Sequence, residues 1–296
     1  ELNLRAGKKK IDPKKKEQII PCLASIKAKE ISTESNRAPL DLICVIDKSG
    51  SMMGEKMSLV KDTFDFLIDE LSDNDRLSLI EFESHPNRLI PLKRMTETGR
   101  KEAKDAVESI QATGGTNIGA AMGVAFETIK KRKYANKVTS ILLLSDGIDG
   151  QAHLAVQQVL TKIGITDDFS VNTFGYGSDH DPEIMGNIAE MKDGVFHFIE
   201  KLDDVSDAFA DCIGGLMSVI AKDVQITVKP ELSEKLPNLQ ISKVYMDQTN
   251  LKENRSTNPR TFTVTYSQIL SGSSKDFVFM LKITNPDGTD VEEEKM

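Results

Sequence analysis

Residues 42–46 form an unbroken apolar run, Leu-Ile-Cys-Val-Ile, which leads directly into Asp47-Lys48-Ser49-Gly50-Ser51. A continuous apolar run of this length is typical of a strand buried on both faces, as in a parallel sheet covered by helices. Such sheets bind ligands beyond the carboxyl ends of their strands. The aspartate and the two serines therefore stand where a divalent cation could be held, since hard cations prefer oxygen ligands.

Two later segments offer further oxygen ligands. Residues 113–117, Thr-Gly-Gly-Thr-Asn, precede a helical pattern, and their glycines allow a tight turn that presents the Thr116 hydroxyl. Residues 140–144 predict a second buried strand, which runs into Ser145-Asp146-Gly147, so Asp146 also lies where a strand ends. The three loops could converge at one end of a parallel sheet.

These segments together resemble the metal-ion-dependent adhesion site of the von Willebrand factor A family. In that site a DxSxS motif is followed by a threonine in a GGT turn and an aspartate in an SDG turn. All the expected positions are occupied, in the expected order, by Asp47, Ser49, Ser51, Thr116 and Asp146. A DxSxS motif alone would more simply be a helix cap or a turn.

The stretches that flank the site, 38–42 and 210–216, are most similar to a plant and protist subgroup of this family, in which some plant members carry a RING finger. The sequence holds no RING-type run of cysteine and histidine, so ligase activity is not carried over to this segment. The order of strands and helices from about residue 39 to 221 predicts an α/β fold with a doubly wound, mostly parallel, Rossmann-like sheet.

The sequence divides into four parts. Residues 1–17 are rich in lysine and predict a mobile basic arm, which is either solvated or in contact with an acidic surface. Residues 18–37 predict one or two strands, residues 38–222 the α/β domain, and residues 223–296 a series of short strands. We expect the N-terminal strand to cross over and join the C-terminal strands in an antiparallel β-sandwich around the inserted domain.

The resemblance implies that the ligand set binds Mg²⁺ and that a carboxylate from a protein partner fills an exposed position on the ion. Two carboxylates and three hydroxyls suit Mg²⁺ better than Ca²⁺, although Ca²⁺ or Mn²⁺ would also fit, and zinc is not expected because no His or Cys joins the set. The predicted rim of the site is Lys48, Met52, Met53 and Asn117, with burial of the two methionines against a neighbouring loop as the alternative. Asp149 either orients the site or only forms a turn.

Three functions are compatible with this pattern. The first is a protein-binding or scaffold module that uses the metal as its contact point, and the second is a structural subunit whose metal site is not essential. The third is an Mg²⁺-dependent phosphate-ester hydrolase, but the sequence has no Walker motif and no DxD pair after the first apolar run, and its histidines are scattered. We therefore predict a binding module and no enzymatic activity.

Composition limits the remaining possibilities. The net charge of −8 argues against nonspecific binding of nucleic acid, and no apolar stretch is long enough to span a membrane. Cys22, Cys44 and Cys212 are too few and too scattered for a disulfide framework or a zinc cluster. This usage favours a reducing compartment, so we predict a cytoplasmic location.

Overall fold

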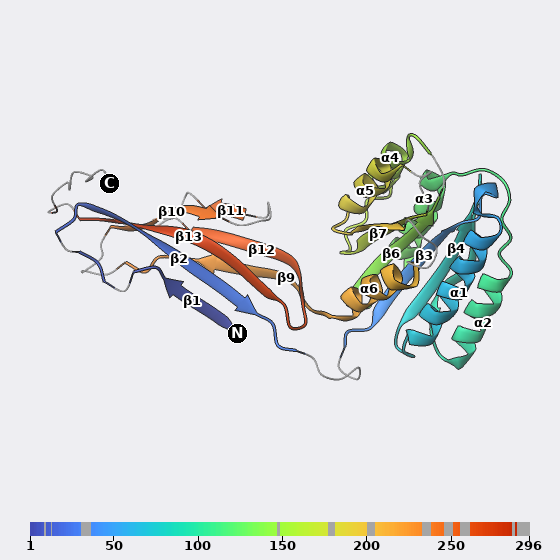
Figure 1. Cartoon of the computed structure of the whole chain (residues 1–296), viewed down its shortest axis with the longest axis horizontal. Helices are drawn as coiled ribbons and strands as arrows, with labels where there is room; N and C mark the ends of the chain where they lie inside the picture. The colour runs from blue at the N-terminus through green and yellow to red at the C-terminus, as the bar shows by residue number, and fades with distance from the viewer. Residues whose placement is uncertain are drawn as a thin grey trace. The chain divides into compact units, whose positions relative to one another are not determined.

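The structure is a computed structural model, and it divides the chain into two compact units. Arg37–Ser218 form one unit, and Glu1–Asn36 with Val219–Met296 form the other. Figure 1 shows the strands and helices of both. The structure describes residues 1–8, 10–12, 14–30, 37–146, 149–176, 181–199, 205–232, 238–245, 251–254, 261–285 and 288.

The unit Arg37–Ser218 is built on a six-stranded sheet with the order β5-β4-β3-β6-β7-β8. All neighbouring strands are parallel except β5, which runs antiparallel to β4. The two central strands, β3 and β6, are buried at every residue, as their apolar sequences predicted. The strands are β3 (Leu40–Asp47), β4 (Arg76–Phe82), β5 (Pro86–Arg94), β6 (Val138–Ser145), β7 (Ser170–Tyr176) and β8 (Phe196–Ile199).

Helices cover both faces of this sheet (Figure 1). On one face, buried residues of α3, α4 and α5 form a core cluster with Ile43, Val45, Ile141 and Leu143 of the central strands. On the other face, Phe209 of α6 stacks on Phe174 of β7 and meets Phe64 of α1 edge to face. The predicted α/β fold with a mostly parallel sheet is confirmed. The helices are α1 (Glu55–Glu70), α2 (Glu97–Glu108), α3 (Ile118–Lys131), α4 (Ala152–Ile163), α5 (Pro182–Glu190) and α6 (Val205–Met217).

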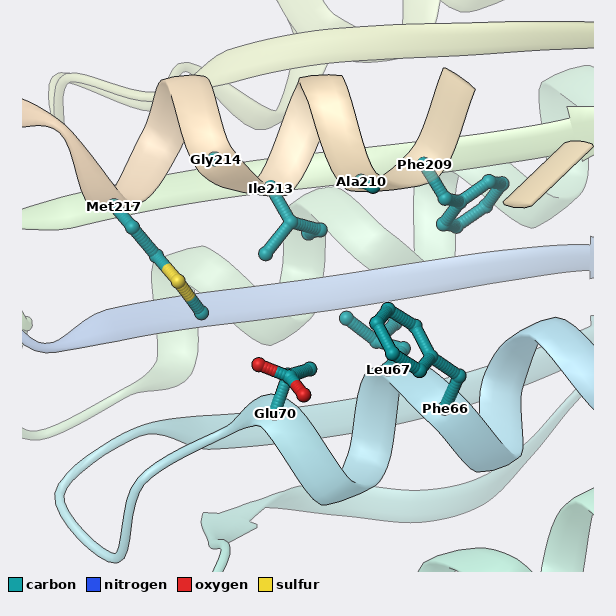
Figure 2. A pocket seen from close by; sticks show the side chains of 8 residues that line it. All are labelled: Phe66, Leu67, Glu70, Phe209, Ala210, Ile213, Gly214 and Met217. Carbon is teal, nitrogen blue, oxygen red and sulfur yellow. The ribbon is translucent and has the colours of Figure 1, made fainter. Parts of the chain in front are cut away.

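A cavity of about 150 Å³ lies between α1 and α6. Figure 2 shows Phe66 and Leu67 of α1 on one side of it and Ile213 and Met217 of α6 on the other. Gly214 of α6 also lines this cavity, and a methyl group added there would meet no atom within 4 Å. Close packing therefore does not require a glycine at this position.

Replacing Gly214 by alanine should stabilise the protein. Glycine in a helix interior costs about 1 kcal/mol relative to alanine, and for a unit of this size that corresponds to a rise in Tm of roughly 2–4 °C. Gly119→Ala in α3 is the matched control, because its added methyl carbon would lie 2.7 Å from the Cβ of Ala155. Thermal unfolding followed by circular dichroism should show Gly214→Ala above the parent and Gly119→Ala below it. A Tm of Gly214→Ala below that of the parent would contradict the conclusion that the added methyl group fits at this position.

The second unit consists of two antiparallel sheets, with strand orders β1-β2-β13-β10 and β11-β12-β9. Strand β2 pairs with β13 along its whole length, from Glu17 opposite Thr284 to Lys27 opposite Ser274, so the N-terminal segment does cross over to the C-terminal one. Buried side chains from both sheets share one cluster, which includes Ile20, Phe279 and Val264. The strands are β1 (Leu2–Ala6), β2 (Glu17–Lys27), β9 (Val219–Val228), β10 (Leu239–Tyr245), β11 (Leu251–Asn254), β12 (Thr261–Leu270) and β13 (Ser274–Thr284).

The N-terminal residues differ from the predicted mobile arm, because Leu2–Ala6 form the edge strand β1, paired with β2. All five side chains of β1 are exposed, so the strand rests on backbone pairing. Leu2, Leu4 and Ala6 do alternate with polar residues, a strand pattern that the lysine-rich composition of residues 1–17 outweighed in the prediction. α6 ends at Met217 and β9 begins at Val219, so the strands of the second unit start within the segment 38–222 that was predicted to form the α/β domain. Among the described residues, no helix has the length and apolar content needed to cross a membrane.

Candidate functional site

The end of β3 is tied to the end of β6 through Asp47. One carboxylate oxygen of Asp47 accepts the backbone N–H of Ser49 at 2.7 Å, and the other accepts the Ser145 hydroxyl. β3 and β6 are neighbouring parallel strands, so both carry their polar ends to the same edge of the sheet. The Asp47 side chain is fully buried and has a fixed orientation.

Four of the predicted ligands are joined by hydrogen bonds, since Asp47 accepts the Ser49 N–H and side-chain contacts link Ser49, Ser51 and Asp146. The hydroxyls of Ser49 and Ser51 lie 3.0 Å apart, and the Ser51 hydroxyl donates to Oδ1 of Asp146 at 2.8 Å. Asp47, Ser49 and Asp146 are buried, whereas Ser51 is exposed. The structure therefore brings these four residues together in one hydrogen-bonded cluster that reaches solvent at Ser51.

The loop that carries Thr116 is held against the first loop by its backbone. The Gly50 N–H donates to the Gly114 carbonyl at 3.1 Å, and the Thr113 N–H donates to the Lys48 carbonyl at 2.6 Å. Gly114 has a φ of 80°, a conformation that favours glycine, and it allows this close approach. Thr116 itself is half-buried. Its place near the site thus follows from the loop backbone, in contrast to the side-chain contacts of the other four residues.

The cluster holds two acidic side chains in a poorly hydrated place. Burial raises the pKa of Asp47, and the negative charge of Asp146 adds to that rise, while hydrogen bonds from Ser145 and Ser49 act in the opposite direction. Both carboxylates would gain from a nearby cation. One such cation is present, because the ammonium of Lys56, in the first turn of α1, contacts Oδ2 of Asp146.

The donor set fits a hard divalent cation. It offers carboxylate and hydroxyl oxygens from three adjacent loops, which are the ligands that Mg²⁺ and similar ions prefer. Within the part of the chain that the structure describes, no group of three or more His, Cys, Asp or Glu gathers as an alternative metal site. A metal bound at this edge of the sheet would be held by Asp47, Ser49, Ser51, Thr116 and Asp146.

The predicted rim residues have different roles. Met53 is 63% exposed and can contact a partner, but Met52 is fully buried, so the prediction that it lies on the rim was wrong. The two methionines fall at the end of the 3-10 turn Gly50–Met52, which directs one inward and leaves the other in solvent. The Lys48 ammonium lies 3.2 Å from a carboxylate oxygen of Glu81, so its charge is already paired.

The other two rim candidates have local structural roles. The Asn117 side chain accepts the Ala120 N–H at 3.0 Å and caps α3. Asp149 accepts the Gln151 N–H, and its carbonyl accepts the Ala152 N–H at the start of α4. The turn interpretation of Asp149 therefore agrees with its contacts. Sequence analysis missed Lys56, whose contact with Asp146 spans 90 residues of chain.

A groove of about 430 Å³ lies between the start of α1 and the residues that follow α2. Met53, Gly54 and Met57 line one side of it, and Ile110–Ala112, which lead into the loop of Thr116, line the other. Lys61, Asp62 and Glu108 add charges to its lining. The lining residues thus follow the loop of Ser49 and Ser51 on one side and precede the loop of Thr116 on the other. The groove offers both apolar and charged contacts.

Known proteins resemble this chain in sequence. The profile of the von Willebrand factor type A domain matches residues 41–211. The E3 ubiquitin-protein ligase WAV3 of Arabidopsis thaliana is 34% identical over 203 residues, which are 66% of this chain and 25% of that protein. The chain therefore spans about a quarter of the length of this curated relative.

Solved structures share the fold. A von Willebrand factor type A protein from Catenulispora acidiphila superposes with a TM-score of 0.65 at 20% identity, covering 100% of this chain and 67% of that one. Proximal thread matrix protein 1 from the mussel byssus, solved with a zinc-occupied MIDAS (metal-ion-dependent adhesion site) motif, gives a TM-score of 0.50 at 18% identity and covers 64% of this chain and 47% of that one.

The expectation of no enzymatic activity is corrected by these relatives. WAV3 is an enzyme, and so are two further Arabidopsis thaliana relatives, the ligase WAVH1 (33% identical, 44% of this chain, 20% of that protein) and the probable ligase WAVH2 (30% identical, 66% and 26%). The sequence has no RING pattern. That absence gave no grounds for a conclusion about the activity of proteins that contain such a segment.

Proposed function

Since the chain belongs to the von Willebrand factor type A family, we propose that it binds a protein partner by presenting Mg²⁺ to an acidic side chain of that partner. The match of the family model to residues 41–211 confirms the family that the DxSxS, GGT and SDG segments predicted. Domains of this family are protein-interaction modules. The observation that carries the proposal is the side-chain cluster from Asp47 through Ser49 and Ser51 to Asp146.

The chemistry of the cluster supports Mg²⁺ as the ion. The two carboxylates balance the charge of a divalent ion without an excess of negative charge, and five protein ligands leave one position of an octahedral Mg²⁺ for water or a carboxylate. Ca²⁺ and Mn²⁺ remain alternatives. The argument against zinc from the lack of His and Cys is insufficient, because the mussel protein carries zinc in its MIDAS motif. Each of these ions therefore belongs in the titrations.

The proposal is tested by selecting peptides from a random displayed library on the immobilised chain, once with Mg²⁺ and once with a chelator. We expect peptides that contain Asp or Glu to be enriched with Mg²⁺ and lost with the chelator. The Asp146→Ala variant should enrich none of them. Enrichment of the same acidic peptides in chelator, or on Asp146→Ala, would contradict a metal-mediated contact.

A charge placed at Met53 should weaken this contact without changing the metal site. We expect Met53→Glu to bind a selected acidic peptide about tenfold more weakly, because like charges across an interface repel, while its Mg²⁺ affinity stays that of the parent. Tyr134→Glu is the matched control, since Tyr134 is also exposed and lies near the opposite ends of the strands. Fluorescence anisotropy measures both affinities. Equal weakening in the two variants would exclude a specific role for Met53.

The Lys56 contact favours a second candidate, a structural subunit whose metal site is not essential. An internal ammonium already lies against Asp146 and supplies part of the charge that the carboxylates need. In that case the variants Asp47→Ala and Asp146→Ala would alter stability but leave partner binding unchanged in a chelator.

The place of the module in a longer protein is part of the proposal. The match to the WAV3, WAVH1 and WAVH2 ligases supports a role in which this segment selects the protein that the rest of a ligase modifies. We also propose that the two antiparallel sheets form a β-sandwich, which their shared buried cluster supports. The free, buried Cys22, Cys44 and Cys212 support a reducing compartment such as the cytoplasm.

A further inference from the structure

Both carboxylate oxygens of Asp146 are engaged by other side chains. Oδ1 accepts the hydroxyl of Ser51 at 2.8 Å, and Oδ2 contacts the ammonium of Lys56. The Asp146 side chain is 0% exposed and that of Lys56 is 24% exposed, so this ion pair is poorly hydrated on its acidic side. A divalent ion held by Asp146 would need the same carboxylate as the ammonium.

The position of Lys56 in its helix is unfavourable without this contact. Lys56 is the second residue of α1, where the exposed N–H groups and the helix dipole disfavour a positive charge. The helix begins after Gly54, which has a φ of 79° and provides no side-chain cap. A lysine in this place therefore depends on a nearby anion, and Asp146 is that anion.

We propose that Lys56 is a built-in counter-ion that competes with the divalent metal for Asp146. When the ammonium is on Oδ2, it balances one of the two buried negative charges and joins α1 to the end of β6. For a metal to be held, the ammonium must leave that oxygen. Lys56 thus lowers the metal affinity of the site and stabilises the metal-free protein, an inference that rests on the proposed metal function.

The charge of Lys56 can be removed while most of its length is kept. Lys56→Gln removes the charge, Lys56→Arg keeps it, and Lys61→Gln removes a charge from the same helix. Lys61 is a suitable control because its ammonium bonds to the Glu108 carbonyl at 2.6 Å and is not placed on the cluster. Calorimetry of Mg²⁺ into the chelator-stripped full chain measures the affinity of each variant.

We expect Lys56→Gln to bind Mg²⁺ at least about tenfold more tightly than the parent, because a positive charge within a few ångströms of the ion repels it at a partly buried site. Lys56→Arg and Lys61→Gln should keep the affinity of the parent within about twofold. In chelator, thermal unfolding should give a lower Tm for Lys56→Gln than for Lys61→Gln. Mg²⁺ should then raise the Tm of Lys56→Gln more than that of the parent.

The outcomes separate this inference from the proposed function. If the parent binds Mg²⁺ and Lys56→Gln binds it equally or more weakly, the competition is overturned while the metal site stands. If parent and Lys56→Gln both bind none of Mg²⁺, Mn²⁺, Ca²⁺ and Zn²⁺, both proposals are overturned. Binding that is seen only in Lys56→Gln would support the competition in its strongest form.

Discussion

Asp47→Asn is expected to lose Mg²⁺ binding and, in a chelator, to be more stable than the parent. The loss of affinity should be at least about 100-fold, because even residues that only support metal ligands are worth 10–100-fold. Asparagine keeps the shape of the side chain, and its oxygen can still accept the Ser49 N–H. The substitution therefore removes the charge of the ligand without opening a cavity.

The stability gain follows from the sign of the pKa shift. Burial, with the charge of Asp146, raises the pKa of Asp47 above that of an ordinary aspartate. The folded state thus binds this proton more tightly than the unfolded state, so ionisation of Asp47 costs stability as the pH rises from the ordinary aspartate range through the raised pKa. Asparagine cannot ionise, and the cost disappears.

Denaturant unfolding in chelator as a function of pH tests this sign. The free energy of unfolding of the parent should fall relative to that of Asp47→Asn as the pH rises, with the largest difference above the raised pKa of Asp47. Asp62→Asn, an exposed position on α1, should follow the parent at every pH. The expected result would be contradicted if Asp47→Asn were less stable than the parent at neutral pH, or if it bound Mg²⁺ with the affinity of the parent.

Asp41→Ala is expected to have the largest effect on folding. The Asp41 carboxylate is fully buried and accepts Nε of Arg76 at 2.7 Å, Nη1 of Arg132 at 2.8 Å and the Asn136 N–H at 3.2 Å. Alanine leaves the two guanidinium groups without this shared anion. Removing one partner of a buried ion pair costs about 3–5 kcal/mol, because the remaining charge is uncompensated.

Asp167→Ala is the matched control for this network. Asp167 binds the same Arg132, through Nη2 at 2.9 Å, but its side chain is 41% exposed. A surface ion pair of this kind is worth at most about 1 kcal/mol. Urea unfolding should therefore separate the two variants clearly. A loss for Asp41→Ala no larger than that for Asp167→Ala would show that the Asp41 network contributes little to stability.

A comparison of Asp41 with Asp47 distinguishes residues that stabilise the fold from residues that bind the metal. Asp41 lies at the start of β3, whereas Asp47 ends the same strand. Asp41→Ala should lower stability without changing the Mg²⁺ affinity of the molecules that remain folded. Asp47→Asn should do the reverse. Calorimetry under conditions in which both variants are folded measures this contrast.

The sequence was most informative where pattern and position coincide. The apolar runs of β3 and β6 predicted buried parallel strands, and parallel strands carry their ends to one edge, so Asp47 and Asp146 could be placed together in advance. The structure adds that Ser49 and Ser51 join them through hydroxyls. The placement of the two aspartates needed only the local sequence and the geometry of a parallel sheet.

Other features depend on contacts that no local pattern records. Lys56 reaches Asp146 because α1 starts beside the end of β6, and a charged residue on a helix is indistinguishable in sequence from a solvated one. Met52 and Met53 are identical in type, and only the turn that contains them decides which one is buried. β1 does carry an alternating pattern in Leu2, Leu4 and Ala6, but the lysine-rich stretch that follows it led to the prediction of a mobile arm.

The most direct test of the metal site is an anomalous diffraction measurement on crystals of this chain grown with Mn²⁺. We predict one strong anomalous peak bounded by the carboxylates of Asp47 and Asp146 and the hydroxyls of Ser49, Ser51 and Thr116, with the Lys56 ammonium withdrawn from Oδ2 of Asp146. If crystals grown with Mn²⁺ showed no anomalous peak at this edge of the sheet, or showed their main peak elsewhere, the proposed metal site would be contradicted.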